Sequence, residues 1–223
     1  MKFKQLIYLM LGGAITICSC NKSENSPAPD MNFAYFPLKL QSVIVYDVDS
    51  TVYSDFNNSV TTFSFQLKDT VTNTFTDAQG DKVYRIERLK KTAVRDWFFL
   101  KVITRKTVNN RAEEFIDNKR YVRLVFPATE QSTWNGNIYN DLGEWRYEIK
   151  NLNQPLTIGT NKLDSTLTTK YEEINALTEE INIETYAKNI GLVKKEVKSV
   201  VKNISSGQIR HGYAYTMRVS SWK

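Results

Sequence analysis

Cysteine and histidine are almost absent from this sequence. Its 223 residues include two cysteines, Cys18 and Cys20, and one histidine, His211. Beyond residue 20, disulfide bonds, cysteine catalysis and cysteine-ligated zinc are therefore excluded. One histidine cannot build a histidine-rich metal site. A Ser-His-Asp triad would need His211, but no G-x-S-x-G motif accompanies it, and its place beside Gly212 predicts an exposed residue near a turn.

The sequence also lacks an apolar run long enough to cross a bilayer as a helix. The apolar stretch from Leu6 to Ile17 has 12 residues, whereas a spanning helix needs about 20. It follows Lys2 and Lys4 and has the length of a signal-peptide core. The stretch leads into Ser19-Cys20, which resembles the lipobox of bacterial lipoproteins, where a small residue precedes the cysteine that becomes acylated. We therefore predict a signal peptide over residues 1–19 and lipid attachment at Cys20.

A polar segment separates this signal from the rest of the chain. Residues 21–30 (NKSENSPAPD) follow the lipid site, and their composition cannot bury apolar surface. We therefore expect residues 20–30 to form a lipidated cysteine and a flexible tether. Residues 31–223 are expected to form one antiparallel β domain, because all-β units of about 200 residues commonly fold as single domains.

The sequence contains no run of charges of one sign. The formal charge is +6, and removing Lys2 and Lys4 with the signal leaves 28 basic against 24 acidic side chains, or +4. These charges are interspersed, which is typical of an ordinary solvated surface. We therefore do not expect a nucleic-acid partner. The predicted partners are the membrane, through the lipid anchor, and an envelope protein or an apolar small molecule; no cofactor is expected.

Alternation of apolar and polar residues dominates the chain from Tyr35 onward. Phe63, Phe65 and Leu67 alternate with polar residues, and residues 213–219 follow the same period of two. Each such pattern predicts a strand with one packed and one solvated face. Turn-forming residues between the runs, such as Asp117-Asn118, predict hairpins. The sequence therefore predicts about ten strands, near residues 40–54, 60–74, 81–91, 97–107, 111–116, 119–127, 144–151, 163–174, 190–203 and 209–222.

Helical periodicity is scarce. Residues 172–187 fit either an amphipathic helix of one or two turns or a strand with a loop. We expect an all-β, mainly antiparallel fold with at most one or two short helices. Long antiparallel strands must close into a barrel or curl into a half-barrel, lipocalin-like or lipoprotein-carrier-like. Its interior either holds an apolar ligand or is filled by the protein's own side chains.

Two carboxylates on the first predicted strand form a D-x-D-x-T pattern. Asp47, Asp49 and Thr51 resemble the first motif of the haloacid-dehalogenase phosphatases, in which the first Asp is the nucleophile and the second a general acid/base beside Mg²⁺. That family needs a parallel α/β sheet, whereas this chain continues as antiparallel hairpins. We favour exposed carboxylates on a strand and keep a Mg-dependent phosphohydrolase as a remote alternative.

One asparagine-rich loop could supply oxygen ligands for Ca²⁺. Residues 134–141 (WNGNIYND) carry several amide oxygens and one carboxylate, but lack the acidic spacing and terminal Glu of an EF-hand. We interpret the loop as a turn with aromatic anchors and predict no metal site.

Three segments together resemble a family of uncharacterised outer-membrane lipoproteins of the Bacteroidetes. They are residues 35–38 (YFPL) with 45–50 (VYDVDS), residues 134–140 (WNGNIYN) and residues 186–196 (YAKNIGLVKKE). The glycine and tryptophan expected between Leu38 and Tyr46 are absent. The resemblance implies a lipid-anchored protein of the outer membrane, on its periplasmic face or at the cell surface, with no known activity.

The sequence thus predicts a non-catalytic envelope protein that binds a partner protein or an apolar ligand. A structural or assembly accessory of the envelope is the alternative. Aromatic residues on the predicted strands are the candidates for the binding surface, where they would form a dry cavity or an exposed patch. They are Trp97, Phe99, Trp145, Tyr213 and Tyr215.

Overall fold

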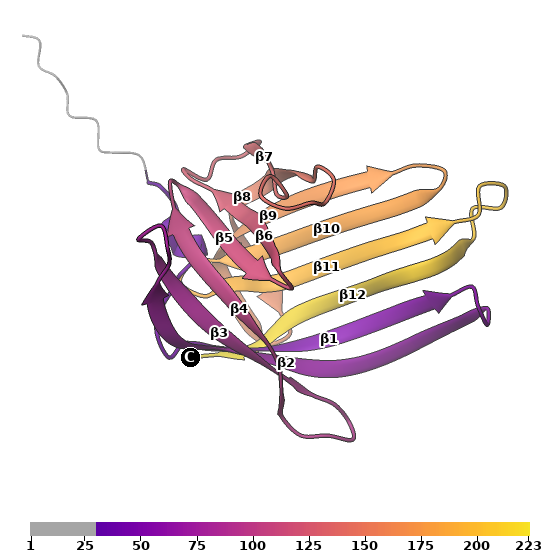
Figure 1. Cartoon of the computed structure of the whole chain (residues 1–223), viewed down its shortest axis with the longest axis horizontal. Helices are drawn as coiled ribbons and strands as arrows, with labels where there is room; N and C mark the ends of the chain where they lie inside the picture. The colour runs from indigo at the N-terminus through magenta and orange to yellow at the C-terminus, as the bar shows by residue number, and fades with distance from the viewer. Residues whose placement is uncertain (1–29) are drawn as a thin grey trace, which may run out of the picture. The chain divides into compact units, whose positions relative to one another are not determined.

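The computed structural model describes residues 30–223, in which twelve strands follow one short 3₁₀ helix (Figure 1). The predicted signal peptide, Cys20 and the tether up to residue 29 lie outside the described residues. The elements are η1 (Phe33–Tyr35), β1 (Val43–Ser54), β2 (Ser59–Thr76), β3 (Lys82–Lys91), β4 (Phe98–Val108), β5 (Arg111–Ile116), β6 (Lys119–Val125), β7 (Thr133–Asn135), β8 (Arg146–Ile158), β9 (Asn161–Ile174), β10 (Thr178–Ala187), β11 (Gly191–Lys202) and β12 (Ile209–Trp222).

All twelve strands belong to one antiparallel sheet. Its order is β6-β5-β4-β3-β2-β1-β12-β11-β10-β9-β8-β7. Each strand pairs with its neighbours in sequence, except that β6 and β7 form the two edges, and β12 returns to pair with β1. The first and last strands therefore meet in the middle of the sheet. The predicted all-β antiparallel fold is confirmed, and η1 is the only helix that the described residues contain.

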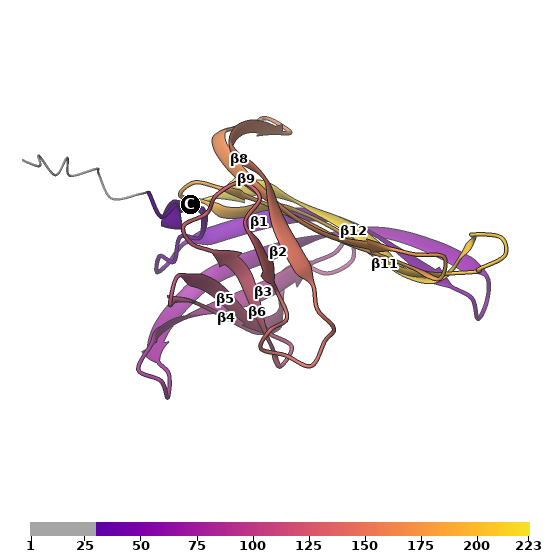
Figure 2. The same cartoon turned by 90° about the horizontal axis from the view of Figure 1, so that it is seen from above.

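The sheet is strongly curved and nearly closes into a barrel. Strands β3–β6 bend away from the plane of β11 and β12 (Figure 2). The two edge strands meet where the Val122 N–H donates to the Gly136 carbonyl at 2.9 Å and the Trp134 Nε1–H donates to the Val122 carbonyl at 2.9 Å. The long strands β1, β2, β11 and β12 extend beyond this closed end (Figure 1). The predicted barrel or half-barrel is therefore confirmed in a partly open form.

The strand prediction was incomplete in three places. Of the two alternatives for residues 172–187, the strand with a loop is correct: β9 runs to Ile174, a turn follows, and β10, which was not among the predicted strands, begins at Thr178. The three-residue strand β7 was not predicted, and β8 continues to Ile158 rather than ending near residue 151. The predicted turn at Asp117-Asn118 is correct, and both residues adopt the left-handed conformation (φ 51° and 61°) that a tight hairpin requires.

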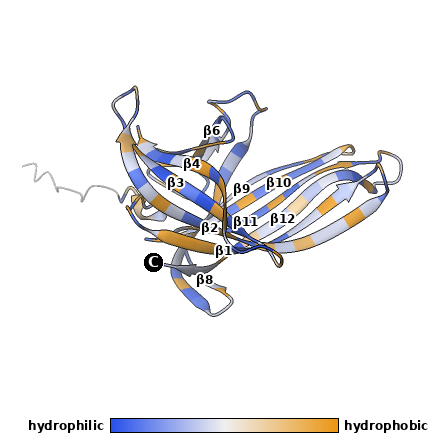
Figure 3. Cartoon of the chain, turned by 60° about the horizontal axis from the view of Figure 1, so that its bottom comes forward, coloured by the Kyte–Doolittle hydropathy of each residue, from blue (hydrophilic) through white to orange (hydrophobic). Residues whose placement is uncertain are grey.

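The core lies on the concave side of the sheet, where the apolar positions of each strand meet. Figure 3 shows apolar and polar residues alternating along the strands. Tyr35 and Phe36 are buried, and the Asn189 N–H donates to the Ala34 carbonyl at 2.7 Å, so η1 packs against the connection between β10 and β11. Within residues 30–223, no helix has the length and apolar character required to cross a membrane.

Candidate functional site

A cavity of about 650 Å³ lies inside the curved sheet. Side chains from β1 to β6 and from β10 to β12 line it, together with the segment from Phe36 to Ser42. Its volume falls within the range of about 300–1,000 Å³ that is usual for small-molecule sites. The barrel interior is therefore not completely filled by its own side chains.

Three of the five predicted aromatic residues line this cavity. Tyr213 and Tyr215 stack with ring centroids 6.4 Å apart on β12, because alternation turns both toward the concave side. Trp145, just before β8, stacks between Tyr121 at 6.3 Å and Tyr171 at 5.4 Å. The structure thus brings Trp145, Tyr213 and Tyr215 to one site.

Trp97 and Phe99 do not join them. The Lys68 ammonium lies 4.4 Å from the Trp97 ring centroid, and Phe99 is 58% exposed. A register shift between Arg88 and Leu89 pairs Phe99 with Leu89, so Phe99 lies on the opposite face from the cavity-lining Arg88. The alternation pattern alone could not reveal that irregularity.

Charged side chains also line the cavity, and sequence analysis did not identify them. On one wall, Arg88 on β3 donates to Asp69 on β2 through Nε and Nη2 at 2.6 and 2.7 Å. On the next pair of strands, Arg105 Nε donates to Glu114 Oε2 at 2.7 Å. These contacts cross four neighbouring strands.

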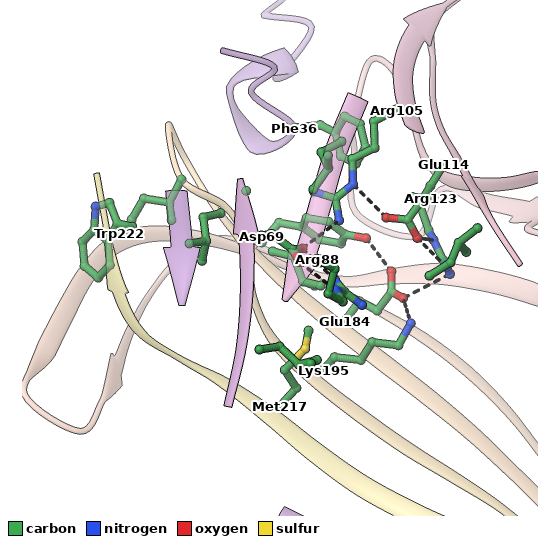
Figure 4. Close-up of a pocket in the computed structure, with 18 of the residues that line it drawn as sticks. Phe36, Asp69, Arg88, Arg105, Glu114, Arg123, Glu184, Lys195, Met217 and Trp222 are labelled. Atoms are coloured by element: carbon green, nitrogen blue, oxygen red, sulfur yellow. Dashed lines mark hydrogen bonds and ion pairs between the residues drawn. The ribbon is translucent and has the colours of Figure 1, made fainter. Parts of the chain in front are cut away.

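The same network continues across the barrel. Arg123 on β6 donates to Glu114 at 2.8 Å and also to Glu184 on β10 at 3.2 Å. Lys195 on β11 donates to Glu184 at 2.6 Å, and the Tyr186 hydroxyl donates to Glu184 as well. Because β6 and β10 are not neighbours in the sheet, Arg123 joins opposite walls (Figure 4). We call this set the ion cluster: Asp69, Arg88, Arg105, Glu114, Arg123, Glu184 and Lys195.

Burial and opposite charges fix the protonation states within the ion cluster. Burial alone would raise the pKa of Glu114, but Arg105 and Arg123 outweigh it and hold the pKa far below its usual value. Burial likewise opposes ionisation of Glu184, whereas Lys195 and Arg123 lower its pKa. Burial, with Glu184 nearby, raises the pKa of Tyr186. The carboxylates of Glu114 and Glu184 are therefore ionised, and the Tyr186 hydroxyl is neutral, near neutral pH.

A signal for the ion cluster was present in the sequence. On β2, Asp69 is in phase with the buried Leu67 and Val71. On β10, Glu184 is in phase with the buried Tyr186. A charge that falls on the apolar phase of a strand is expected to be buried and paired.

The D-x-D-x-T carboxylates lie away from the cavity, on the opposite face of β1. Gln66 donates to Asp47 at 2.8 Å, and Ser64 and Arg218 donate to Asp49 at 2.7 and 2.9 Å. The Ser64 hydrogen bond, followed by that of Arg218, lowers the pKa of Asp49, the reverse of what a general acid requires. The sheet is antiparallel throughout, unlike the sheet on which the phosphatase resemblance depends.

His211 lies on β12 near its first residue and is exposed, with Nδ1 3.2 Å from the Asp55 carboxylate. Its place beside a turn agrees with the sequence prediction. Within residues 30–223, no group of three or more His, Cys, Asp or Glu side chains is arranged to hold a metal ion.

The asparagine-rich loop closes the barrel. The Asn135 Oδ1 accepts from the Asn137 N–H at 2.9 Å, and the Asn140 Oδ1 accepts from the Leu142 N–H at 2.9 Å. The Asn140 Nδ2 donates to the Arg120 carbonyl on β6 at 2.9 Å. These amide oxygens serve the loop's own backbone, which supports the interpretation as an anchored turn.

Comparison with known proteins identifies the fold. No protein-family model matches the chain, and no curated protein matches its sequence. A similar solved structure is a candidate exported protein with a YmcC-like fold from Bacteroides fragilis, with a TM-score of 0.50 and 9% identity over 84% of this chain and 98% of that chain. A candidate lipoprotein from Parabacteroides distasonis has a TM-score of 0.47 and 10% identity over 85% of this chain and 98% of that chain.

At 9% identity, the Bacteroides fragilis structure shows a shared fold and nothing further. The architecture of this chain is therefore similar to the YmcC-like fold. The three sequence motifs that suggested a lipoprotein family are matched by no family model, so membership of that family stays a prediction.

Proposed function

We propose that this protein is a lipid-anchored protein of the outer membrane that binds an apolar or amphipathic small molecule inside its barrel without transforming it. The observation that carries the proposal is the cavity of about 650 Å³ bordered by Trp145, Tyr213 and Tyr215. Concave, largely apolar sites with a few polar groups are the usual form of small-molecule sites. The predicted signal peptide and the predicted lipid attachment at Cys20 support the proposed location.

Native mass spectrometry of the protein purified from its own envelope tests this proposal. We expect a retained small molecule whose mass persists through gentle activation. A protein that is bare in every preparation, and that also fails to bind the neutral fluorophore N-phenyl-1-naphthylamine, would contradict it.

A pair of variants locates the binding. Tyr215→Ala removes a ring from the cavity and is expected to weaken N-phenyl-1-naphthylamine binding several-fold, since each buried aromatic contributes about 1 kcal/mol or more. Phe99→Ala removes an exposed ring outside the cavity and is the matched control. Equal effects of the two substitutions would place the binding elsewhere.

Binding of a partner protein is a second candidate, favoured by the hairpin tips. The turns after β1, β9 and β11 carry Phe56 (97% exposed), Leu177 (46%) and Ile204 (69%). These tips lie at the same end of the long strands (Figure 1). If native mass spectrometry finds a protein partner, and Phe56→Ser releases it while the cavity stays empty, the accessory role replaces ligand binding.

A further inference from the structure

The ion cluster carries more positive than negative charge. Its cations outnumber its carboxylates by four to three, and every member is at most 14% exposed. Lys39 and Lys223 also border the cavity but are exposed, so they do not add to this buried charge. An uncompensated charge in a buried, low-dielectric site is costly. A negatively charged group bound in the cavity would supply the missing charge.

The cations retain donors that could serve such a group. Arg88 uses Nε and Nη2 for Asp69, and Lys195 donates through Nζ to Glu184. A guanidinium and an ammonium each have more N–H donors than these contacts use. Both side chains line the cavity, so an anionic oxygen there can accept from them.

The buried side chain of Asn182 also supports a ligand in the cavity beside the ion cluster. Asn182 is 5% exposed and lines the cavity two residues before Glu184 on the same face of β10. Its Oδ1 has no hydrogen-bond partner among the described residues. Buried polar atoms are almost always paired, so Asn182 is poised for a hydroxyl or amide donor of a ligand.

The remainder of the lining is largely apolar. Ile44, Val48, Phe65, Met217 and Trp222 border the cavity beside the ion cluster. In Figure 4, Met217 and Trp222 lie apart from Arg105 and Arg123. The cavity thus has a charged part and an apolar part, which matches a molecule with one charged end.

We propose that the cavity binds an anionic amphiphile, with its carboxylate or phosphate on Arg88 and Lys195, a neighbouring donor on Asn182, and its apolar chain along the β1–β12 wall. This ligand class depends on the proposed small-molecule function and makes it specific. No bond is formed or broken; the ligand is held by ion pairs, hydrogen bonds and apolar contact.

The test compares ligands with the same twelve-carbon chain and different heads. The exported chain from residue 21 is titrated at neutral pH with dodecanoate, dodecyl phosphate, neutral monolauroyl glycerol and dodecyltrimethylammonium, each below its critical micelle concentration. Displacement of N-phenyl-1-naphthylamine reports binding. We expect at least one anion to bind about tenfold or more tightly than the neutral ester, because hydrogen bonds to charged groups contribute strongly in a buried site. The cation is expected to bind most weakly.

Dodecanoate and dodecyl phosphate distinguish a fatty acid from a phospholipid as the source of the head group. Lys195→Met removes the positive excess and is expected to abolish most of the preference for anions while neutral binding remains. Lys194→Met, the next residue on β11, is the control, since Lys194 pairs with Glu196 and does not line the cavity.

The outcomes separate the two proposals. If the neutral ester binds as tightly as the anions, the anionic ligand class is wrong and the small-molecule function stands. If neither the fluorophore nor any amphiphile binds, both the small-molecule function and the anionic ligand class are wrong. The comparison of head groups uses the unaltered protein, so the test holds even if Lys195→Met fails to fold.

Discussion

At the scale of single residues, Glu184 holds the ion cluster together. It is 2% exposed and accepts hydrogen bonds from Arg123, Lys195 and Tyr186. Glu184→Gln leaves the buried Lys195 without its carboxylate and Arg123 with Glu114 alone. We therefore expect the free energy of unfolding to fall by about 3 kcal/mol or more. Urea denaturation followed by circular dichroism measures the change.

Glu196 provides the control for that substitution. It lies on β11 and pairs with Lys194 at 2.8 Å, on a partly exposed surface. Glu196→Gln is expected to change stability by less than about 0.5 kcal/mol. Similar losses for the two variants would show that the ion cluster adds nothing beyond a surface ion pair.

The residues of the site were only partly predictable from sequence. Trp145, Tyr213 and Tyr215 were identified because large aromatic side chains in strict alternation predict a packed face. The cations were missed because charged residues are normally assigned to the solvated face, and a single strand does not show which other strand faces it. Arg123 and Glu184 are 61 positions apart, so only the curvature of the sheet brings them together.

At the scale of elements, Gly212 permits the pairing of β11 with β12. Its φ is +129°, and a Cβ at this position would lie 2.2 Å from the Ser199 carbonyl oxygen. Neither the backbone conformation nor the space suits a side chain. We expect Gly212→Ala to lower the free energy of unfolding by more than about 2 kcal/mol, measured by urea denaturation.

Gly143→Ala is the matched control, because a Cβ at Gly143 would have no atom within 4 Å. We expect its stability to remain within about 0.5 kcal/mol of the unaltered protein. A Gly212→Ala variant as stable as Gly143→Ala would mean that β11 and β12 can separate there without cost.

The edge between β6 and β7 is the second element that a substitution can test. Trp134→Phe removes the Nε1–H donor to the Val122 carbonyl but keeps a ring to stack on Tyr147, 5.7 Å away. We expect a loss of about 1 kcal/mol, concentrated at this edge, and faster hydrogen exchange of the β6 amides. Trp97→Phe, outside the cavity, is expected to leave β6 unchanged. Acceleration spread evenly over all strands would contradict a local closure.

The elements that the sequence predicted best are those with regular alternation and clear turns. Strand β10 was ambiguous because Ile181, Ile183 and Tyr186 do not keep a period of two. Strand β7 has three residues, too few for any period to show. The pairing of β1 with β12 joins residues such as Ile44 and Trp222, and no local pattern indicates so distant a contact.

At the scale of the whole molecule, the ion cluster links both walls of the barrel around the cavity. Buried ion pairs are weak contributors to stability, and apolar side chains of similar volume often replace them without loss. A cluster of seven charged residues that borders a cavity is therefore better explained by binding than by stability alone. Under the proposed function, the partly open barrel would give a ligand access, while the closed end would hold the charged side chains in place.

The charge states of the cluster make stability depend on pH in a defined direction. The folded-state pKa values of Glu114 and Glu184 lie below their ordinary value of 4.5. Their contribution to stability is therefore complete above about pH 4.5 and is lost as the pH falls toward the folded-state values, because the unfolded chain takes up protons first. Exposed carboxylates with a lowered pKa, such as Asp49, also lose their contribution to stability as the pH falls.

Comparison of the unaltered protein with Glu184→Gln isolates the buried contribution. The substitution removes one titrating group of the cluster and leaves the exposed carboxylates in place. The difference in unfolding free energy between the two proteins is thus expected to be largest near about pH 7 and to narrow progressively below about pH 4.5. Urea titrations at a series of pH values measure this difference. A gap that stays constant down to about pH 3 would show that Glu184 stabilises the barrel through packing and not through its charge.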